Sequence, residues 1–92
     1  MIVILCSSFK AACRAFDIFL QLLDDNEPWS IQKVFYGEKC IELEDDLRYI
    51  FIDHRFVHAF DKMHPDIVDV QAFFAELNEL YYPDEEIDYY DL

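Results

Sequence analysis

The chain has 92 residues, of which 54% are hydrophobic and 17% aromatic, so it has the size of one domain and too much apolar material for a disordered chain. Its 20 acidic residues against 7 basic ones give a net charge of −13, which excludes binding to nucleic acid or anionic lipid through general charge attraction. No apolar run approaches the ~20 residues of a membrane-spanning helix, and the apolar opening is too short for a secretion signal, so we expect a cytoplasmic protein.

Residues 2–6 are a continuous apolar run rich in β-branched side chains, which predicts a buried strand. Ser7 or Ser8 can then cap the first turn of a helix. This helix is predicted to run to about Leu23, where acidic residues and Pro28 end it. Apolar residues recur along it at helical spacing and define its buried face: Phe9, Ala12, Cys13, Phe16, Leu20 and Leu23.

After Trp29 apolar and polar residues alternate, which is the period of a strand. Strands are predicted over 31–36, 40–44 and 47–53, and short turns separate them. Three successive strands joined in this way predict an antiparallel meander. In the middle strand we expect Ile41 and Leu43 to point inward, and Glu42 and Glu44 outward.

Two further helices are predicted after the strands. Arg55 to Lys62 should form a short one, and a longer one should run from Asp66 or Asp69 to about Tyr81. The short helix is expected to turn three side chains inward: Phe56, Val57 and Phe60.

The predicted order is β-α-β-β-β-(α)-α. This order indicates a small two-layer α+β fold, with a mainly antiparallel sheet and the helices on one face. Residues 83–92 have neither a helical nor a strand period. We therefore expect one domain over residues 1–82, followed by an acidic, tyrosine-rich tail over residues 83–92.

Charge is unevenly distributed along the chain. All seven basic residues lie between Lys10 and Lys62, whereas residues 63–92 contain nine acids and no Lys or Arg. The last thirty residues therefore carry −9, and the first 62 carry only −4. Two interpretations stay open: the charge serves solubility alone, or it forms a surface that binds a positively charged protein.

The second interpretation has a physical basis in the spacing of the acids. Neighbouring acids on a helix place their carboxylates about 5–6 Å apart, comparable with the spacing of successive phosphates along a DNA strand. Such an array, with aromatic anchors beside it, could occupy a nucleic-acid-binding groove. The predicted contact residues are Asp69, Glu76, Glu79, Tyr82, Asp84, Glu85, Glu86, Asp88, Tyr89, Tyr90 and Asp91.

Through the basic-free stretch 63–92 and the acidic run 84–91, the chain resembles the small anti-defence proteins of bacteriophages and mobile elements. That group includes anti-CRISPR inhibitors, restriction-inhibiting DNA mimics and uracil-DNA glycosylase inhibitors. The resemblance lies in composition, so no binding residue carries over from it. It implies a non-enzymatic inhibitor that blocks the nucleic-acid site of a basic enzyme, with a CRISPR effector as the first candidate, in the cytoplasm of the host cell.

A different class of function also fits the sequence. The protein could be an adaptor or structural subunit that binds through its sheet face or an edge strand, with apolar contacts around Trp29, Phe35 and Tyr36. An antiparallel meander leaves an edge strand that needs cover, and this would allow a homodimer. Binding of this kind would depend little on salt.

One cluster has metal-ligand chemistry. His54, His58 and Asp61 are spaced i, i+4 and i+7, so on an α-helix they would share one face and could ligate zinc or nickel. Arg55 stands where the HExxH motif has its Glu, and its charge would repel a cation. The alternative is that these histidines lie at the helix edge and bond to carboxylates. We expect no metal, no cofactor and no catalytic activity.

The three cysteines, Cys6, Cys13 and Cys40, are an odd number without metal-ligand spacing, so we expect reduced structural thiols. Residues 4–8 resemble the phosphocysteine loop of sugar-phosphotransferase IIB domains, which would imply a phosphate acceptor at Cys6. Phe9 stands where that loop needs a glycine, and the chain lacks the alternating β-α order of that family's fold. A strand end followed by a serine cap is the simpler interpretation.

Overall fold

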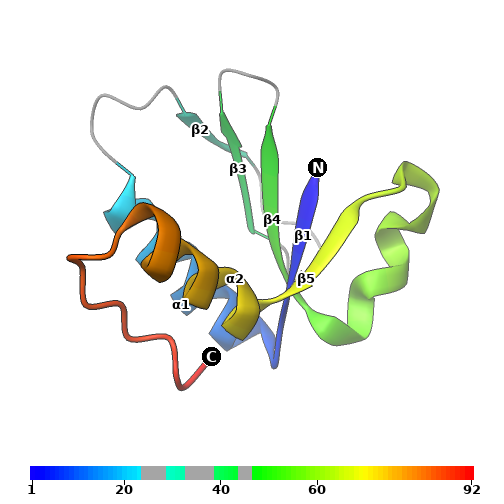
Figure 1. The fold of residues 1–92 in the computed structure, drawn as a ribbon. Helices are drawn as coiled ribbons and strands as arrows, with labels where there is room; N and C mark the ends of the chain where they lie inside the picture. The colour runs from blue at the N-terminus through cyan, green and yellow to red at the C-terminus, as the bar shows by residue number, and fades with distance from the viewer. Residues whose placement is uncertain (24–28, 33–38, 44–46) are drawn as a thin grey trace.

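The computed structural model (Figure 1) describes residues 1–23, 29–32, 39–43 and 47–92. Nine helices and strands are found in these ranges, and two of the helical segments are not α-helical: η1 is a 3-10 helix and η2 is a π-helix. In chain order the elements are β1 (Ile2–Cys6), α1 (Phe9–Leu22), β2 (Trp29–Gln32), β3 (Lys39–Leu43), β4 (Arg48–Asp53), η1 (His54–Met63), β5 (Asp66–Asp69), α2 (Val70–Glu76) and η2 (Leu77–Tyr81). The protein therefore combines helices and strands, as predicted.

The strands form one sheet in the order β2-β3-β4-β1-β5. The antiparallel meander β2-β3-β4 is confirmed, but β1 pairs parallel with both β4 and β5. The prediction of a mainly antiparallel sheet is therefore wrong. The physical reason is that β1 is a central strand buried on both faces: Val3 and Ile4 point to opposite faces, and each is 0% exposed. Strands buried on both faces are typical of parallel pairing.

The two faces of the sheet carry separate clusters of buried side chains. On one face Ile4 and Phe51 pack with Phe16 of α1 and Phe74 of α2, and Figure 1 shows α1 and α2 together on this side. On the other face Val3, Ile50 and Ile52 pack with Phe60 of η1. The prediction that the helices share one face holds for α1 and α2 but is wrong for η1, which covers the opposite face.

Helix α1 begins as its sequence predicts. Ser8 is the N-cap, and its side-chain oxygen accepts a hydrogen bond from the backbone N–H of Ala11 at 3.1 Å. Phe9, expected inward, is the first residue of the helix and is 44% exposed. The buried stripe consists of Ala11, Ala12, Ala15, Phe16 and Phe19. Three alanines in this stripe allow the helix to lie close to the sheet.

The short helix after β4 also differs from its prediction. It is a 3-10 helix, in which side chains three residues apart eclipse one another. Phe60 is buried as expected, Val57 is half-buried, and Phe56 is 45% exposed. Asp53 caps this helix, because its side chain accepts from the backbone N–H of Arg55 at 3.1 Å.

The second main helix is confirmed from Val70, with Asp69 as its N-cap and Gln71 N–H as the donor to that cap at 2.9 Å. The four residues before it were not predicted as a strand, yet they form β5 at the edge of the sheet. The helix changes to a π-turn at Leu77 and ends at Tyr81, close to the predicted end.

Parts of the predicted meander lie outside the described residues. These parts are residues 33–36 of the first predicted strand, the turns, and the side chains of Ile41, Glu42, Leu43 and Glu44. None of the helices in the described ranges is both long and apolar enough to cross a membrane.

Candidate interaction surface

The acids of residues 63–92 are all at the surface. Each of the nine is exposed in the structure. The ion pairs seen at Asp53 and Asp61 include none of the nine acids, and none of the nine is paired with a basic residue in the described part of the chain. The nine are Asp66, Asp69, Glu76, Glu79, Asp84, Glu85, Glu86, Asp88 and Asp91.

The predicted helix flank of Asp69, Glu76 and Glu79 is only partly formed. Asp69 lies at the start of α2 and Glu76 at its last α-helical residue. After Glu76 the backbone closes a wider turn, in which Tyr82 N–H donates to Leu77 C=O at 2.9 Å. A turn that closes one residue later rotates less per residue. Glu79 therefore lies further round the helix axis from Asp69 and Glu76 than an α-helix would place it.

The tail is held on the helix by two amide side chains. Asn78 Nδ2 donates to the carbonyls of Tyr82 at 2.9 Å and Glu85 at 2.8 Å. Gln71 Nε2 donates to the carbonyls of Tyr89 at 2.9 Å and Leu92 at 3.1 Å. Because the acceptors are backbone carbonyls, these bonds hold the backbone of the tail independently of the tail's side chains.

Apolar side chains complete this anchoring. Ile87 and Leu92 are 6% and 8% exposed and belong to the same buried cluster as α1 and α2. Figure 1 shows the tail folding back along these helices on the side away from the sheet. The segment expected as a tail thus packs against the domain, while its five acids stay exposed.

The tyrosines of the predicted contact set differ in their surroundings. Tyr89 is half-buried and stacked between Phe74, at a centroid distance of 6.2 Å, and Tyr90, at 4.8 Å. Burial raises the pKa of Tyr89, and the neighbouring Tyr90 raises it further. Tyr90 is 77% exposed, whereas Tyr82 is half-buried. Of the three, Tyr90 offers the most ring surface to a partner.

The chain matches none of the known proteins with which it was compared. No protein-family model matches it, and neither a curated protein nor a solved structure does. The function must therefore be argued from the residues of this chain.

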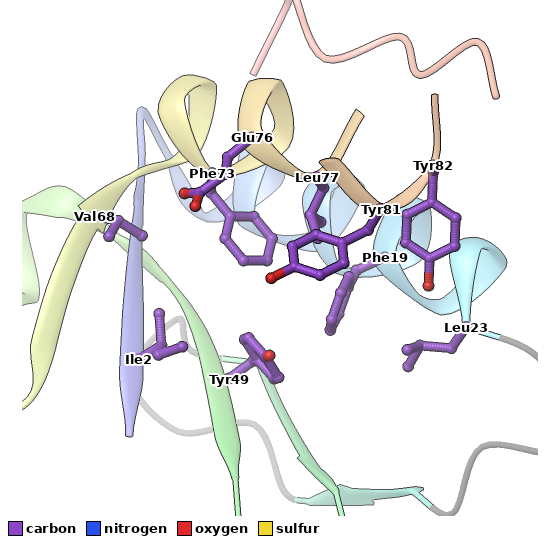
Figure 2. A pocket seen from close by; sticks show the side chains of 10 residues that line it. All are labelled: Ile2, Phe19, Leu23, Tyr49, Val68, Phe73, Glu76, Leu77, Tyr81 and Tyr82. Atoms are coloured by element: carbon purple, nitrogen blue, oxygen red, sulfur yellow. The ribbon is translucent and has the colours of Figure 1, made fainter. Parts of the chain in front are cut away.

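A pocket of about 410 Å³ lies between the helices and the sheet (Figure 2). Phe19 of α1, Tyr49 of β4 and Phe73 of α2 form an aromatic group in its wall, with ring centroids 4.9 to 5.9 Å apart. Tyr81, which is 67% exposed, and Glu76 also line it. Burial raises the pKa of Tyr49, and the nearby phenols of Tyr81 and Tyr82 raise it further.

Sequence reasoning missed this pocket because six elements and the C-caps of α1 and η2 contribute to it. The sequence signal for the pocket was the pair Tyr81 and Tyr82 at the end of the predicted helix. Two adjacent tyrosines have more aromatic surface than one face of a helix can bury.

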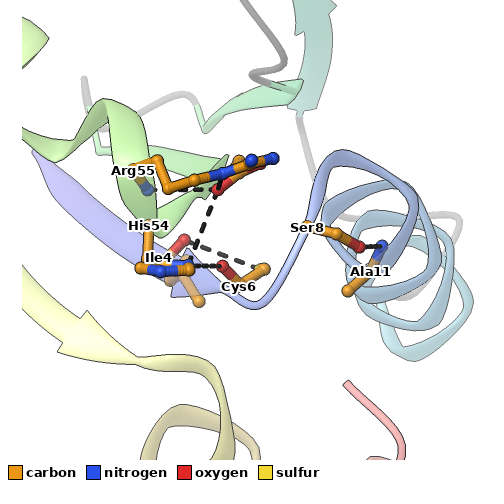
Figure 3. Close-up of polar contacts among 7 residues, drawn as sticks. Ile4, Cys6, Ser8, Ala11, His54 and Arg55 are labelled. Carbon is orange, nitrogen blue, oxygen red and sulfur yellow. Dashed lines mark hydrogen bonds and ion pairs between the residues drawn. The ribbon is translucent and has the colours of Figure 1, made fainter.

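Polar contacts also gather at the carboxyl ends of the parallel strands β1 and β4, around Cys6, His54 and Arg55 (Figure 3). Cys6 is 1% exposed, its Sγ donates to Ile4 C=O at 3.7 Å, and burial raises the pKa of its thiol to about 12. A thiol with this pKa is almost entirely protonated at neutral pH and is a poor nucleophile. Cys6 therefore behaves as a core residue, in agreement with the structural thiol that we expected.

The structure brings together only two of the three metal-ligand candidates, His58 and Asp61. His54 Nδ1 lies 3.2 Å from Cys6 C=O, whereas His58 Nδ1 lies 2.9 Å from Asp61 Oδ2. The α-helical face predicted for these residues is wrong, because a 3-10 helix aligns residues three apart and separates those four apart. No group of three or more metal-ligating side chains is found within the described ranges.

Proposed function

We propose that this protein is a non-enzymatic inhibitor that presents the carboxylates of its last thirty residues to the basic groove of a nucleic-acid-processing enzyme. The observation that supports the proposal best is that all nine acids are exposed and that none is in an ion pair with a described basic residue. Carboxylates that are not neutralised by ion pairs within the protein attract a positively charged partner with their full charge.

Anchoring of the tail strengthens this proposal. A flexible acidic tail would lose conformational entropy on binding, at about 1–2 kcal/mol for each backbone residue fixed. Here Gln71 and Asn78 already hold four carbonyls between Tyr82 and Leu92. A partner would therefore meet carboxylates whose backbone is already ordered, and preorganisation of this kind favours tight binding.

The target follows from charge and from the compositional resemblance. A surface of this sign binds proteins whose grooves are lined with Lys and Arg, and nucleic-acid enzymes have such grooves. Among them we place a CRISPR effector first, because the small acidic anti-defence proteins that this chain resembles include anti-CRISPR inhibitors. The inhibitor would act by occupying the nucleic-acid site.

The experiment measures inhibition of DNA or RNA cleavage by a panel of purified CRISPR effectors and phage-targeted nucleases. We expect inhibition of at least one, with an affinity that falls steeply as NaCl is raised. The variant Asp84→Asn/Glu85→Gln/Glu86→Gln should weaken this inhibition about tenfold or more, since interface charges that face a basic groove contribute several kcal/mol in sum.

The control removes two exposed acids outside residues 63–92, Asp17→Asn/Asp61→Asn. It is compared with the tail pair Asp84→Asn/Glu85→Gln, which changes the net charge by the same amount. A specific tail surface predicts a large effect for the tail pair and a small one for the control. Equal effects would mean that net charge alone acts. No inhibition across the panel would exclude these enzymes as targets.

One observation favours the second function, an adaptor that binds through a strand. β5 is an edge strand, and its Ile67 is 46% exposed. A partner strand added to this edge would bind through backbone hydrogen bonds and apolar side chains. Its affinity would then change little with salt and would be lost in the variant Ile67→Pro, which removes a backbone donor.

A further inference from the structure

The pocket beneath α2 and η2 offers an unusual set of groups for a ligand. Its walls are apolar and aromatic, and its polar side chains are the phenols of Tyr49, Tyr81 and Tyr82 and the carboxylate of Glu76. Among the described residues that line it there is no Lys, Arg or His. The side-chain groups of the pocket can therefore accept hydrogen bonds and attract positive charge, and none of them offers a cation to an anionic ligand.

Aromatic rings strengthen this preference. The faces of Phe and Tyr carry partial negative charge and attract ammonium groups within about 6 Å of the ring centroid. Phe19, Tyr49 and Phe73 are packed at tilted or edge-on angles to one another. The rings therefore do not cover one another's faces by parallel stacking. Figure 2 shows the ring of Tyr81, from η2, beside Phe73 and Phe19, with the carboxylate of Glu76, from α2, at the Phe73 end of the group.

The size and position of the pocket also fit a small molecule. Its volume of about 410 Å³ lies within the range of roughly 300–1,000 Å³ that ligand pockets occupy. Tyr81 belongs to the π-helical turn η2, and such turns occur frequently at functional sites. Because Tyr81 is 67% exposed, its ring can move without disturbing the buried cluster.

From these observations we infer that the pocket binds a small lipophilic ammonium compound, with its apolar body against Phe19 and Phe73 and its cation between Glu76 and the phenol of Tyr81. Glu76 and Tyr82 also belong to the contact residues predicted for the macromolecular partner. The inference still does not depend on that partner, because it concerns binding of a small molecule to the free chain. It assigns the pocket a ligand class by charge and shape.

The test is a set of three probes that differ in charge: 2-phenylethylamine, 2-phenylethanol and 3-phenylpropanoate. Each is titrated into the ¹⁵N-labelled full chain, and backbone amide shifts are followed. We expect saturable shifts with the amine at about 1 mM or below, centred on the amides of Leu77, Tyr81 and Tyr82. The alcohol should bind at least ~5-fold more weakly, and the carboxylate should give no saturable shift.

Two pairs of variants locate the interaction. Glu76→Gln should weaken amine binding about 5-fold and leave alcohol binding within about twofold, because one partly solvated charge pair is lost. Glu79→Gln removes the same charge from a residue that does not line the pocket, and should change neither by more than about twofold. Tyr81→Ala should weaken both probes, whereas Tyr90→Ala, at an equally exposed tyrosine outside the pocket, should not.

Three results would overturn the inference. Equal binding of amine and alcohol would show that the pocket does not select a cation. Equal effects of Glu76→Gln and Glu79→Gln would assign the selectivity to overall charge. Shifts confined to amides away from the pocket would place the probe elsewhere. Failure of the nuclease panel above would leave all of these readouts unchanged.

Discussion

Asp53 is a buried carboxylate in a protein that has an excess of exposed ones. Its side chain is 1% exposed, caps η1 through Arg55 N–H, and accepts from Arg55 Nε with both oxygens at 3.1 Å. The Arg55 hydrogen bonds lower the pKa of Asp53 to about 2. The carboxylate is thus ionised at every physiological pH, and its role is to join the end of β4 to the start of η1.

This geometry predicts a stability difference that depends on pH. Asp53→Asn should lower the melting temperature by several degrees at pH 7, because it removes the acceptor pair that holds the Arg55 guanidinium. A lowered folded-state pKa gives stability that is present above the unfolded-state value, near 4, and lost as the pH falls through about 2. The two proteins should therefore converge as the pH approaches 2.

Thermal unfolding of both proteins at pH 7, 5, 3 and 2 measures this convergence. Asp17→Asn, at an exposed position on α1, is the control and should stay within about 0.5 kcal/mol of the parent protein throughout. A melting difference for Asp53→Asn that stayed constant down to pH 2 would contradict the assigned role.

At the scale of elements, the sequence predicted those features that depend on residues close together in the chain. The strand over the apolar run 2–6, the serine cap before α1 and the antiparallel pairing of the meander were all found. Parallel pairing of β1 was not, because it depends on which distant strands lie beside it. β5 was missed because four residues with an Asp at each end look like the start of a helix.

The packing of the tail against the domain also could not be predicted from neighbouring residues. Ile87 and Leu92 are separated by polar residues and have no period, so nothing local marked them as core. The tail backbone is also held by the side-chain amides of Gln71 and Asn78, for which the sequence predicted no role. For the candidate sites, exposure of the acids could be predicted from composition. The pocket, and the displacement of Glu79 away from Asp69 and Glu76 by η2, could be found only from the three-dimensional structure.

The anchoring of the tail is itself testable. Gln71→Met keeps the length of the side chain and removes both hydrogen bonds to the tail, so we expect a loss of about 1–3 kcal/mol in the free energy of unfolding. Amide hydrogen exchange should also become faster in residues 86–92. Gln21→Met, at an exposed position of α1, is the matched control. Unchanged exchange in the tail of Gln71→Met would show that Ile87 and Leu92 hold it without the amide.

At the scale of the whole molecule, the charge of −13 acts on folding as well as on binding. Carboxylates without counter-charges repel one another and destabilise the compact state. Salt screens this repulsion over a distance of about 10 Å at 0.1 M. The same ions also screen the attraction between the acidic surface and a basic partner. One set of side chains therefore predicts two salt dependences of opposite sign.

We expect the melting temperature of the free protein to rise by several degrees between about 0.02 and 0.5 M NaCl, while its affinity for the partner falls over the same range. In Asp84→Asn/Glu85→Gln/Glu86→Gln the net charge changes from −13 to −10. The rise in melting temperature should then shrink by about 40%, since repulsion grows with the product of the charges. Scanning calorimetry and binding measured in the same buffers compare the two effects directly. A melting temperature that falls with NaCl would mean that attractive ion pairs dominate the folded state, and the acidic surface could not then be uncompensated.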